Sequence, residues 1–339
     1  MNHIIFFSGG KASLATADYV KSTYPNGNII LYFTDTRWEN EDLYRFINEA
    51  SDKLQLPMLT HSAGLNPMQL MFEKKIIYNS MIGDCSKLLK MRVSADYLKK
   101  GKKPTFEQWR NKEYLREEDF ITDATLYFGI GFDEMHREGA IRKNWQPFKV
   151  EMPLIENNIY KDDVLVKYDI RQPILYDHGF SHNNCNGRCV KAGQGHYKLL
   201  KERMPDVFQK IMEQEHHLKI CVSSFRYITL GNKPKDDISP ENIIPLEVQE
   251  IMLQELDDAY RDYFYDRSDK PKFYIHPCSS ATSEFMRIKQ YSFMKRDSKP
   301  YPIRDLRDEV DNDMQIDIFD IGGCGCFVDS FAELEEVNV

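Results

Sequence analysis

The sequence predicts an α/β protein whose N-terminal part is a parallel β-sheet flanked by helices. Two observations carry this prediction. Short apolar runs alternate with amphipathic ones along the start of the chain, and the apolar spacing switches between strand-like and helical. Longer helical segments follow after about residue 155. We therefore expect one domain over residues 1–155 and a mainly helical region with cysteine motifs over residues 156–339.

The first elements alternate in type. We expect strands at 3–7, 28–35 and 57–61 and helices at 11–24 and 40–54. Within the second helix, Leu43, Phe46 and Ile47 recur at helical spacing and should face the sheet. The order strand, helix, strand, helix, strand is typical of a parallel sheet covered by helices.

The rest of the chain is less regular up to one more strand. Residues 65–122 show no clear period, and the apolar run beginning at Leu126 predicts a strand that ends in a loop. Further on, residues 193–218 and 246–264 have a helical pattern. No internal repeat is present.

Composition and charge narrow the class of protein. The chain has 339 residues, 42% of them hydrophobic, and a net charge of −8, so a nucleic-acid partner would need a local basic surface. No apolar run is long enough for a membrane span, and the N-terminus lacks the features of a signal peptide. We expect a cytoplasmic protein with no membrane partner, whose seven cysteines are too few and too scattered for a disulfide framework.

A glycine pair follows the first strand. Ser8, Gly9 and Gly10 lie between that strand and a helix starting near Lys11, and the hydroxyl of Ser13 is close in sequence. Glycine lets the backbone approach an anion, and the free N–H groups at a helix N-terminus attract phosphate. A plain turn would leave the same pattern, so the pattern alone does not separate the two.

This segment is not a Walker loop. Ala12 stands where a Walker loop has serine or threonine, and Ile5 stands where it has its first glycine.

FFSGGKAS resembles instead the SGG-x-x-S signature of PP-loop ATP pyrophosphatases, in particular the phosphoadenosine phosphosulfate (PAPS) reductase-like branch. Three further blocks resemble that branch in the same order: YFTDTRWENEDLYRF, CSKLLKMRVSADYL and LYFGIGFDEMHR. The resemblance implies a Rossmann-like fold of the adenine nucleotide alpha hydrolase-like type. It also implies that ATP and Mg²⁺ are the cofactors.

The resemblance also assigns residues. It implies nucleotide contacts from the glycine loop, the second strand end and the fourth block, which are Ser8, Gly9, Gly10, Lys11, Ser13, Phe33, Thr34, Asp35, Thr36, Glu39, Gly129 and Ile130. It implies catalytic roles for Lys11, Lys90, Asp133 and Arg137. Many members have aspartate at the position of Ala12, so Mg²⁺ would here depend on the ATP phosphates and on other carboxylates.

Two close cysteine pairs lie far apart in sequence: Cys185 with Cys189, and Cys324 with Cys326. Thiolates favour zinc or an iron–sulfur cluster, so the two pairs predict one four-thiolate metal site. A redox or persulfide-carrying pair and buried structural cysteines are the alternatives. The block GFSHNNCNGRCVKAGQGHY and the tail GGCGCF resemble motifs of PAPS reductase-like proteins, many of them phage-encoded, without deciding between these roles.

The chain lacks the C-terminal Glu-Cys-Gly-hydrophobe-His motif of PAPS reductases. Our leading hypothesis is therefore an ATP-dependent adenylating enzyme of sulfurtransferase type, which converts ATP to AMP and pyrophosphate. Its acceptor would be an unidentified small molecule, nucleotide or nucleic acid. A PAPS or adenylylsulfate reductase is one alternative, and a non-catalytic ATP-sensing module of a phage or defence complex is another. Assembly as a homo-oligomer is left open.

Overall fold

The computed structural model describes residues 1–74, 76–79, 83–224, 250–251, 254, 292–296 and 299–306. These residues form two compact units. Unit 1 comprises Met1–Asn66 and Asp84–Cys189, and unit 2 comprises the described parts of Pro67–Gly83 and Val190–Gly322. Residues 156–189 thus group with unit 1, while the predicted domain division at residue 155 stays a prediction.

Unit 1 is built on a six-stranded sheet in the order β4-β3-β2-β1-β5-β6. Its strands are β1 (Asn2–Phe6), β2 (Asn28–Asp35), β3 (Met58–Ser62), β4 (Phe106–Arg110), β5 (Thr125–Phe128) and β6 (Lys149–Glu151). All neighbours run parallel except β3 and β4, which are antiparallel. The chain order reverses direction at β1, between β2 and β5, which is where parallel α/β sheets bind ligands. The predicted α/β fold with a parallel sheet is confirmed, and β4 adds an antiparallel edge.

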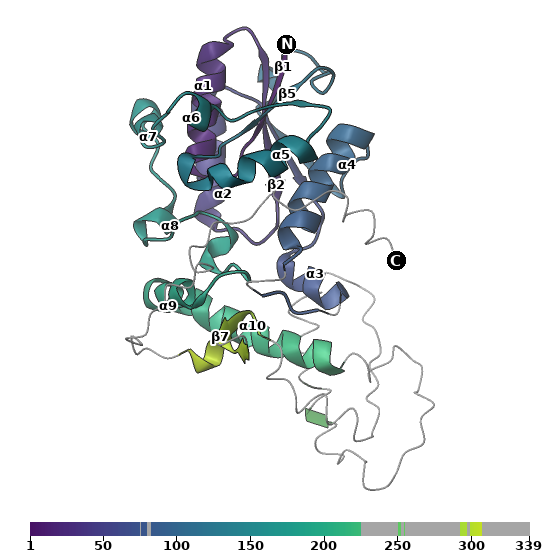
Figure 1. The fold of residues 1–339 in the computed structure, drawn as a ribbon, viewed down its shortest axis with the longest axis vertical. Helices are drawn as coiled ribbons and strands as arrows, with labels where there is room; N and C mark the ends of the chain where they lie inside the picture. The colour runs from purple at the N-terminus through teal and green to yellow at the C-terminus, as the bar shows by residue number, and fades with distance from the viewer. Residues whose placement is uncertain are drawn as a thin grey trace. The chain divides into compact units, whose positions relative to one another are not determined.

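Helices cover both faces of this sheet (Figure 1). They are α1 (Lys11–Thr23), α2 (Glu41–Leu54), α4 (Arg92–Lys100), α5 (Glu138–Asn144), α6 (Pro153–Glu156) and α7 (Asp163–Tyr168). The short helix α8 (Ile174–Asp177) follows them in unit 1. A π-helical turn (Lys87–Met91) precedes α4, and 3₁₀ turns lie at Lys112–Tyr114, Phe132–Arg137 and Cys185–Gly187.

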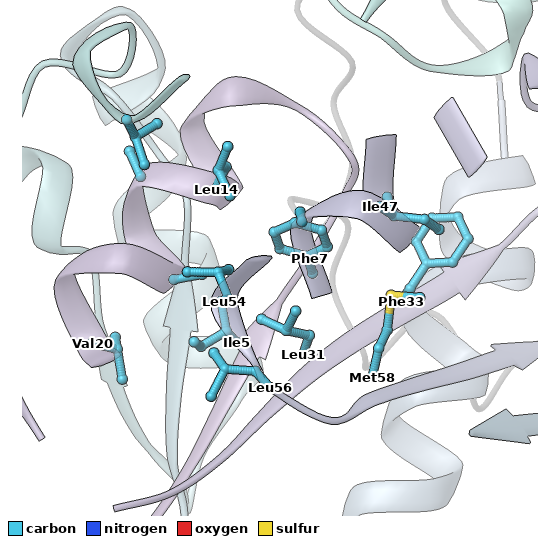
Figure 2. Close-up of a cluster of buried hydrophobic side chains, with 14 of the residues drawn as sticks. Ile5, Phe7, Leu14, Val20, Leu31, Phe33, Ile47, Leu54, Leu56 and Met58 are labelled. Atoms are coloured by element: carbon cyan, nitrogen blue, oxygen red, sulfur yellow. The ribbon is translucent and has the colours of Figure 1, made fainter. Parts of the chain in front are cut away.

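Strand alternation divides the core into two clusters. Ile5, Leu31 and Phe33 point to the face covered by α1 and α2, where they pack against Leu14 and Ile47 (Figure 2). The residues between them along each strand point to the opposite face, which α4 and α5 cover. Because successive side chains of a strand face opposite ways, this alternation fixes which residues at the strand ends can meet.

Capping residues explain where helix α2 begins and ends. Asn40 caps it by accepting the backbone N–H of Asp42 at 2.7 Å, and Gln55 ends it in a left-handed conformation. Leu43, Phe46 and Ile47 are buried, as their spacing predicts. The result is a rigid helix beside the end of β1.

Unit 2 contains α3 (Pro67–Lys74), α9 (Gln194–Arg203), α10 (Pro205–Ser224), the antiparallel pair β7 (Met294–Arg296) and β8 (Lys299–Tyr301), and a 3₁₀ turn (Ile303–Asp305). The buried carboxylate of Glu215 on α10 accepts the backbone N–H groups of Phe293 and Ile303 at 2.8 and 2.9 Å. The predicted helix at 193–218 is present as α9 and α10, and the one at 246–264 falls largely outside the described residues. Among the described helices, none has the length and apolar character that crossing a bilayer requires.

Candidate functional site

The loop between β1 and α1 has the geometry of an anion site. Gly9 adopts a positive φ of 79°, and a Cβ there would lie 2.9 Å from the side chain of Leu43. Gly10 is the N-cap of α1 and provides no side-chain cap. The first intrahelical bond runs from the N–H of Leu14 to the carbonyl of Gly10, so the N–H groups of Ala12 and Ser13 have no partner within the helix.

Gly129 brings the end of β5 against this loop. A Cβ at Gly129 would lie 2.8 Å from backbone atoms of Ala12 and Ser13. Only glycine fits that approach without moving the backbone. The Ser13 hydroxyl donates to the carbonyl of Gly10 at 2.8 Å, which fixes the first turn of α1. Ile130, the next predicted contact, is buried in the core.

Two residues that sequence reasoning missed flank Lys11. Its ammonium lies 2.5 Å from a carboxylate oxygen of Asp162 and 4.8 Å from the centre of the Tyr176 ring. The Tyr176 hydroxyl is hydrogen bonded to the backbone of Lys11, and burial raises the pKa of Tyr176 to about 12. A Cβ on Gly10 would lie 2.9 Å from that hydroxyl, so a larger residue at position 10 would displace the Tyr176 side chain. No local pattern marks Tyr176.

The predicted adenosine contacts at the end of β2 point to two opposite faces of the sheet. Asp35 accepts the Tyr44 hydroxyl at 2.8 Å and, with Phe33, lines a cavity of about 270 Å³ against α2 and the outer strands. Thr36 is buried and donates its hydroxyl to Glu39 at 2.8 Å. Thr34 is also buried. Because Phe33 and Thr34 point to opposite sides of the sheet, their side chains cannot contact one face of the same ligand.

A buried ion pair lies beside Thr36. The ammonium of Lys90, carried by the π-helical turn, is 3.7 Å from Glu39, and both side chains are less than 10% exposed. Burial acts to lower the pKa of Lys90, but the Glu39 carboxylate and three nearby thiols raise it above its ordinary value. The thiols are those of Cys85, Cys185 and Cys189. Lys90 is therefore charged within a largely dry environment.

The segment 183–189, called here the cysteine loop, returns to this cluster from far along the chain. Asn183 donates its side-chain amide to the carbonyl of Gly9 at 2.9 Å. The backbone N–H of Cys185 donates to Glu39 at 2.5 Å, and Asn40 donates to Asn186 at 2.7 Å. The cysteine loop is thus bonded to the start of α2 and to the loop between β1 and α1, residues 7–10, which is called here the phosphate loop.

Arg188 completes this loop. Its guanidinium stacks 3.6 Å from the ring centre of Trp38, and burial lowers the pKa of Arg188 to about 10, which still leaves it charged near pH 7. The Nε of Arg188 and the Nε1 of Trp38 are buried with no hydrogen-bond partner among the described residues. So is the side-chain oxygen of Asn183.

The predicted metal ligands are only partly within the described chain. Cys185 and Cys189 are buried and their thiols are hydrogen bonded, and this bond together with burial raises the pKa of Cys185 well above its ordinary value. Cys324 and Cys326 lie outside the described residues. Within the described residues no three His, Cys, Asp or Glu side chains are placed to share a metal ion, so the four-thiolate site stays a prediction. Cys85, which sequence reasoning assigned to the core or a loop, belongs to the surroundings of Lys90.

The remaining predicted residues follow β5. Arg137 is buried and hydrogen bonded to Glu134 within the 3₁₀ turn. Asp133 is exposed, with Lys161 at 3.7 Å. The turn begins directly after Gly129–Gly131, so both residues are attached to the strand end that touches the phosphate loop.

The comparisons with known proteins agree with the N-terminal assignment. Residues 2–114 match the family model of the phosphoadenosine phosphosulfate reductase domain. The matched segment runs from β1 to the 3₁₀ turn after β4, and it contains the phosphate loop, Glu39 and Lys90. No curated protein and no solved structure matches the chain significantly.

Proposed function

We propose that the protein is an ATP-dependent adenylating enzyme, because residues 2–114 match the phosphoadenosine phosphosulfate reductase domain, which is part of the PP-loop ATP pyrophosphatase superfamily of nucleotide-binding enzymes. It would transfer AMP to an acceptor oxygen and release pyrophosphate. The acceptor is a small molecule, a nucleotide or a nucleic acid, and the product would then receive sulfur or another nucleophile.

One observation supports this proposal most directly. The phosphate loop, the Glu39–Lys90 pair and the cysteine loop are joined by hydrogen bonds, at Gly9 and at Glu39. A loop that only turned the chain would need neither a buried ion pair nor a returning segment beside it. Buried charges and closely packed glycines gathered at the reversal point of a parallel sheet are typical of a ligand site.

The phosphates of ATP would bind at the N–H groups of Ala12 and Ser13 in the first turn of α1, with Lys11 neutralising charge after it leaves Asp162. Lys11 is well placed for this exchange, because Asp162 is 69% exposed and a surface ion pair of this kind contributes little. Arg137, attached to the strand end at Gly129, would act on the charge that develops on the leaving pyrophosphate. Mg²⁺ would supply further neutralisation when bound with ATP, and with Ala12 in the loop its protein ligands would be other carboxylates, such as Asp133.

The adenosine would lie near the end of β2. Glu39 accepts the Thr36 hydroxyl and so fixes it, which leaves the Thr36 oxygen as an acceptor for a ribose hydroxyl or the base. The unpartnered polar atoms of Trp38 and Asn183 support a ligand nearby, because buried polar groups are almost always hydrogen bonded when a site is filled. In this proposal Phe33 and Asp35 contribute through the backbone, since their side chains face α2.

Two alternative functions are each supported by one observation. The thiol pair beside Lys90 favours a PAPS or adenylylsulfate reductase, and Ala12 in the phosphate loop favours a module that binds ATP without turnover. The first needs a sulfonyl-bearing nucleotide as substrate, and the second predicts affinity without product.

Product analysis separates the three. The chain is incubated with Mg²⁺ and ATP labelled at the α-phosphate, alone and with total tRNA, DNA or a small-metabolite fraction. An adenylating enzyme releases unlabelled pyrophosphate and forms labelled AMP or a labelled adduct, and both depend on the acceptor. Formation of ADP, or tight ATP binding with no turnover in every fraction, contradicts the proposal. Release of sulfite from PAPS supports the reductase instead.

A further inference from the structure

We propose that Cys185 and Cys189 form a redox-active dithiol that closes to an intrachain disulfide and thereby changes the affinity of the neighbouring nucleotide site. The two thiols are hydrogen bonded to each other, and only three residues separate them. Closing the bond requires the sulfur atoms to move from hydrogen-bond contact to about 2.05 Å. This is a small displacement for a loop that already places both sulfurs side by side.

The backbone of the pair is strained. Cys185 has a φ of 58° and Asn186 a φ of 50°, both in the left-handed region that residues with a Cβ seldom adopt. Such conformations persist where surrounding contacts hold them, and they concentrate at functional sites. Here the holding contacts are the bond from Cys185 to Glu39 and the bond from Asn40 to Asn186.

Two cations and one carboxylate lie near the thiols. Lys90 and Arg188 both interact electrostatically with Cys185, and Glu39 is the opposing carboxylate. In the closed loop the thiol hydrogen bond, burial and Glu39 outweigh these cations and raise the pKa of Cys185. When the loop opens and water reaches the sulfurs, the two cations can stabilise the negative charge that develops on an attacking or leaving sulfur.

The oxidation is a thiol–disulfide exchange with a small disulfide such as oxidised glutathione. One cysteine gives up its proton and attacks a sulfur of that disulfide, which releases one reduced thiol. The second cysteine then gives up its proton and attacks the mixed disulfide, forming the Cys185–Cys189 bond and releasing a second reduced thiol. Two electrons and two protons pass from the pair to the small disulfide. Both sulfurs are buried, so the exchange requires a local opening of the cysteine loop.

Glu39 connects the pair to the nucleotide site. It accepts the N–H of Cys185 with one oxygen and the hydroxyl of Thr36 with the other, which also faces Lys90. A disulfide that pulls on Cys185 therefore moves the carboxylate that fixes Thr36, a residue proposed to contact the adenosine, and we expect weaker ATP binding. By linkage, ATP must then make the disulfide harder to form by the same factor.

The test uses the full chain in a series of glutathione buffers from reducing to oxidising, with and without ATP. Thiols are alkylated at equilibrium, and disulfides are mapped by peptide mass spectrometry. We expect a Cys185–Cys189 disulfide whose formation with ATP present needs at least fivefold more oxidising buffer. Cys85→Ser removes the third thiol near Lys90 and should keep that disulfide, whereas Cys189→Ser should abolish it.

Three outcomes overturn the proposal: both cysteines stay reduced in every buffer, they pair with other partners, or elemental analysis finds zinc or iron held by them. A disulfide whose formation does not depend on ATP, in a chain that binds ATP, overturns the coupling. The coupling rests on the proposed function, and a separate ATP titration of the reduced chain tests that. If the reduced chain binds no ATP, the proposed function and the coupling fail together, while disulfide mapping still decides the dithiol.

Discussion

The phosphate loop and the cysteine loop belong to one candidate site, but they are built in different ways. The phosphate loop is made of neighbours in sequence: a strand, two glycines and a helix N-terminus. The cysteine loop acquires its position from partners 146 to 174 residues away, at Glu39, Asn40 and Gly9. A local motif can therefore be read from the sequence, whereas a convergent loop can be placed only once the fold is known.

The ion pair at the phosphate loop and the ion pair beside the cysteine loop differ in how deeply they are buried. Lys11 in the phosphate loop pairs with an exposed carboxylate, while the side chains of Lys90 and Glu39 are 7% and 0% exposed. Buried pairs depend on each other far more than surface pairs do. Substitutions should therefore damage the folded state at the cysteine loop and ligand binding at the phosphate loop.

The largest expected effect is on Lys90. Lys90→Met leaves the Glu39 carboxylate buried beside one fewer cation, and it should lower the free energy of unfolding by about 3 to 5 kcal/mol in a urea titration. The double variant Glu39→Gln with Lys90→Met should recover most of that loss. Lys11→Met, the matched change at the more exposed pair, should cost less than about 1 kcal/mol. Equal costs for Lys90→Met and Lys11→Met would remove the contrast.

Gly129 tests how tightly β5 holds the phosphate loop. In Gly129→Ala the added methyl group meets the backbone of Ala12 and Ser13, so we expect a loss of about 2 to 3 kcal/mol in stability and a clear loss of ATP affinity. Gly139→Ala on α5 is the control, because a Cβ there meets nothing within 4 Å and alanine favours a helix. If both variants bind ATP as the wild type does, the close approach at Gly129 is not needed.

The same contrast explains what the sequence could predict. The strands β1, β2, β3 and β5 follow from apolar runs, and α1 and α2 follow from helical spacing, because each depends on neighbours in sequence. Strand β4 has exposed or half-buried residues throughout, FEQWR, and it pairs antiparallel at the edge, so its pattern carries no burial signal.

The residues of the candidate site also differ in whether the sequence could predict them. The glycine loop, Glu39 and Lys90 lie in recognisable blocks, and the structure brings the last two together. Tyr176, Asn183 and Trp38 were missed, because each acts through contacts with residues far away in sequence, which no spacing encodes. Cys85 had a weak signal, its place in the block that carries Lys90.

The sheet that carries both loops contains a buried histidine whose protonation should affect the stability of the folded chain. His3 on β1 is buried and bonded to the Tyr127 hydroxyl at 2.9 Å, and burial lowers the pKa of His3 from 6.5 to about 4. Between those values the unfolded chain binds a proton that the folded chain does not, so stability is lost as the pH falls from 6.5 towards 4.

We expect that loss to be about 2 kcal/mol after allowance for solvent screening. Urea titrations at pH 7 and pH 4.5 measure it, and the difference should shrink in His3→Gln but not in His136→Gln, which changes an exposed histidine. An unchanged difference in His3→Gln would show that other groups set the acid sensitivity.

The most direct test of the central claim, that the two loops form one nucleotide site, is a calorimetric ATP titration of four proteins: wild type, Lys11→Ala, Asn183→Ala and the double variant. Lys11→Ala removes a charged contact and should weaken binding by roughly ten- to a hundredfold. Asn183→Ala removes the bond that holds the Gly9 carbonyl, and it should weaken binding by about tenfold or less. Because both act on the same loop, the double variant should lose less than the product of the two, by about threefold or more. Unchanged ATP affinity in Asn183→Ala, with the fold intact, would contradict the claim.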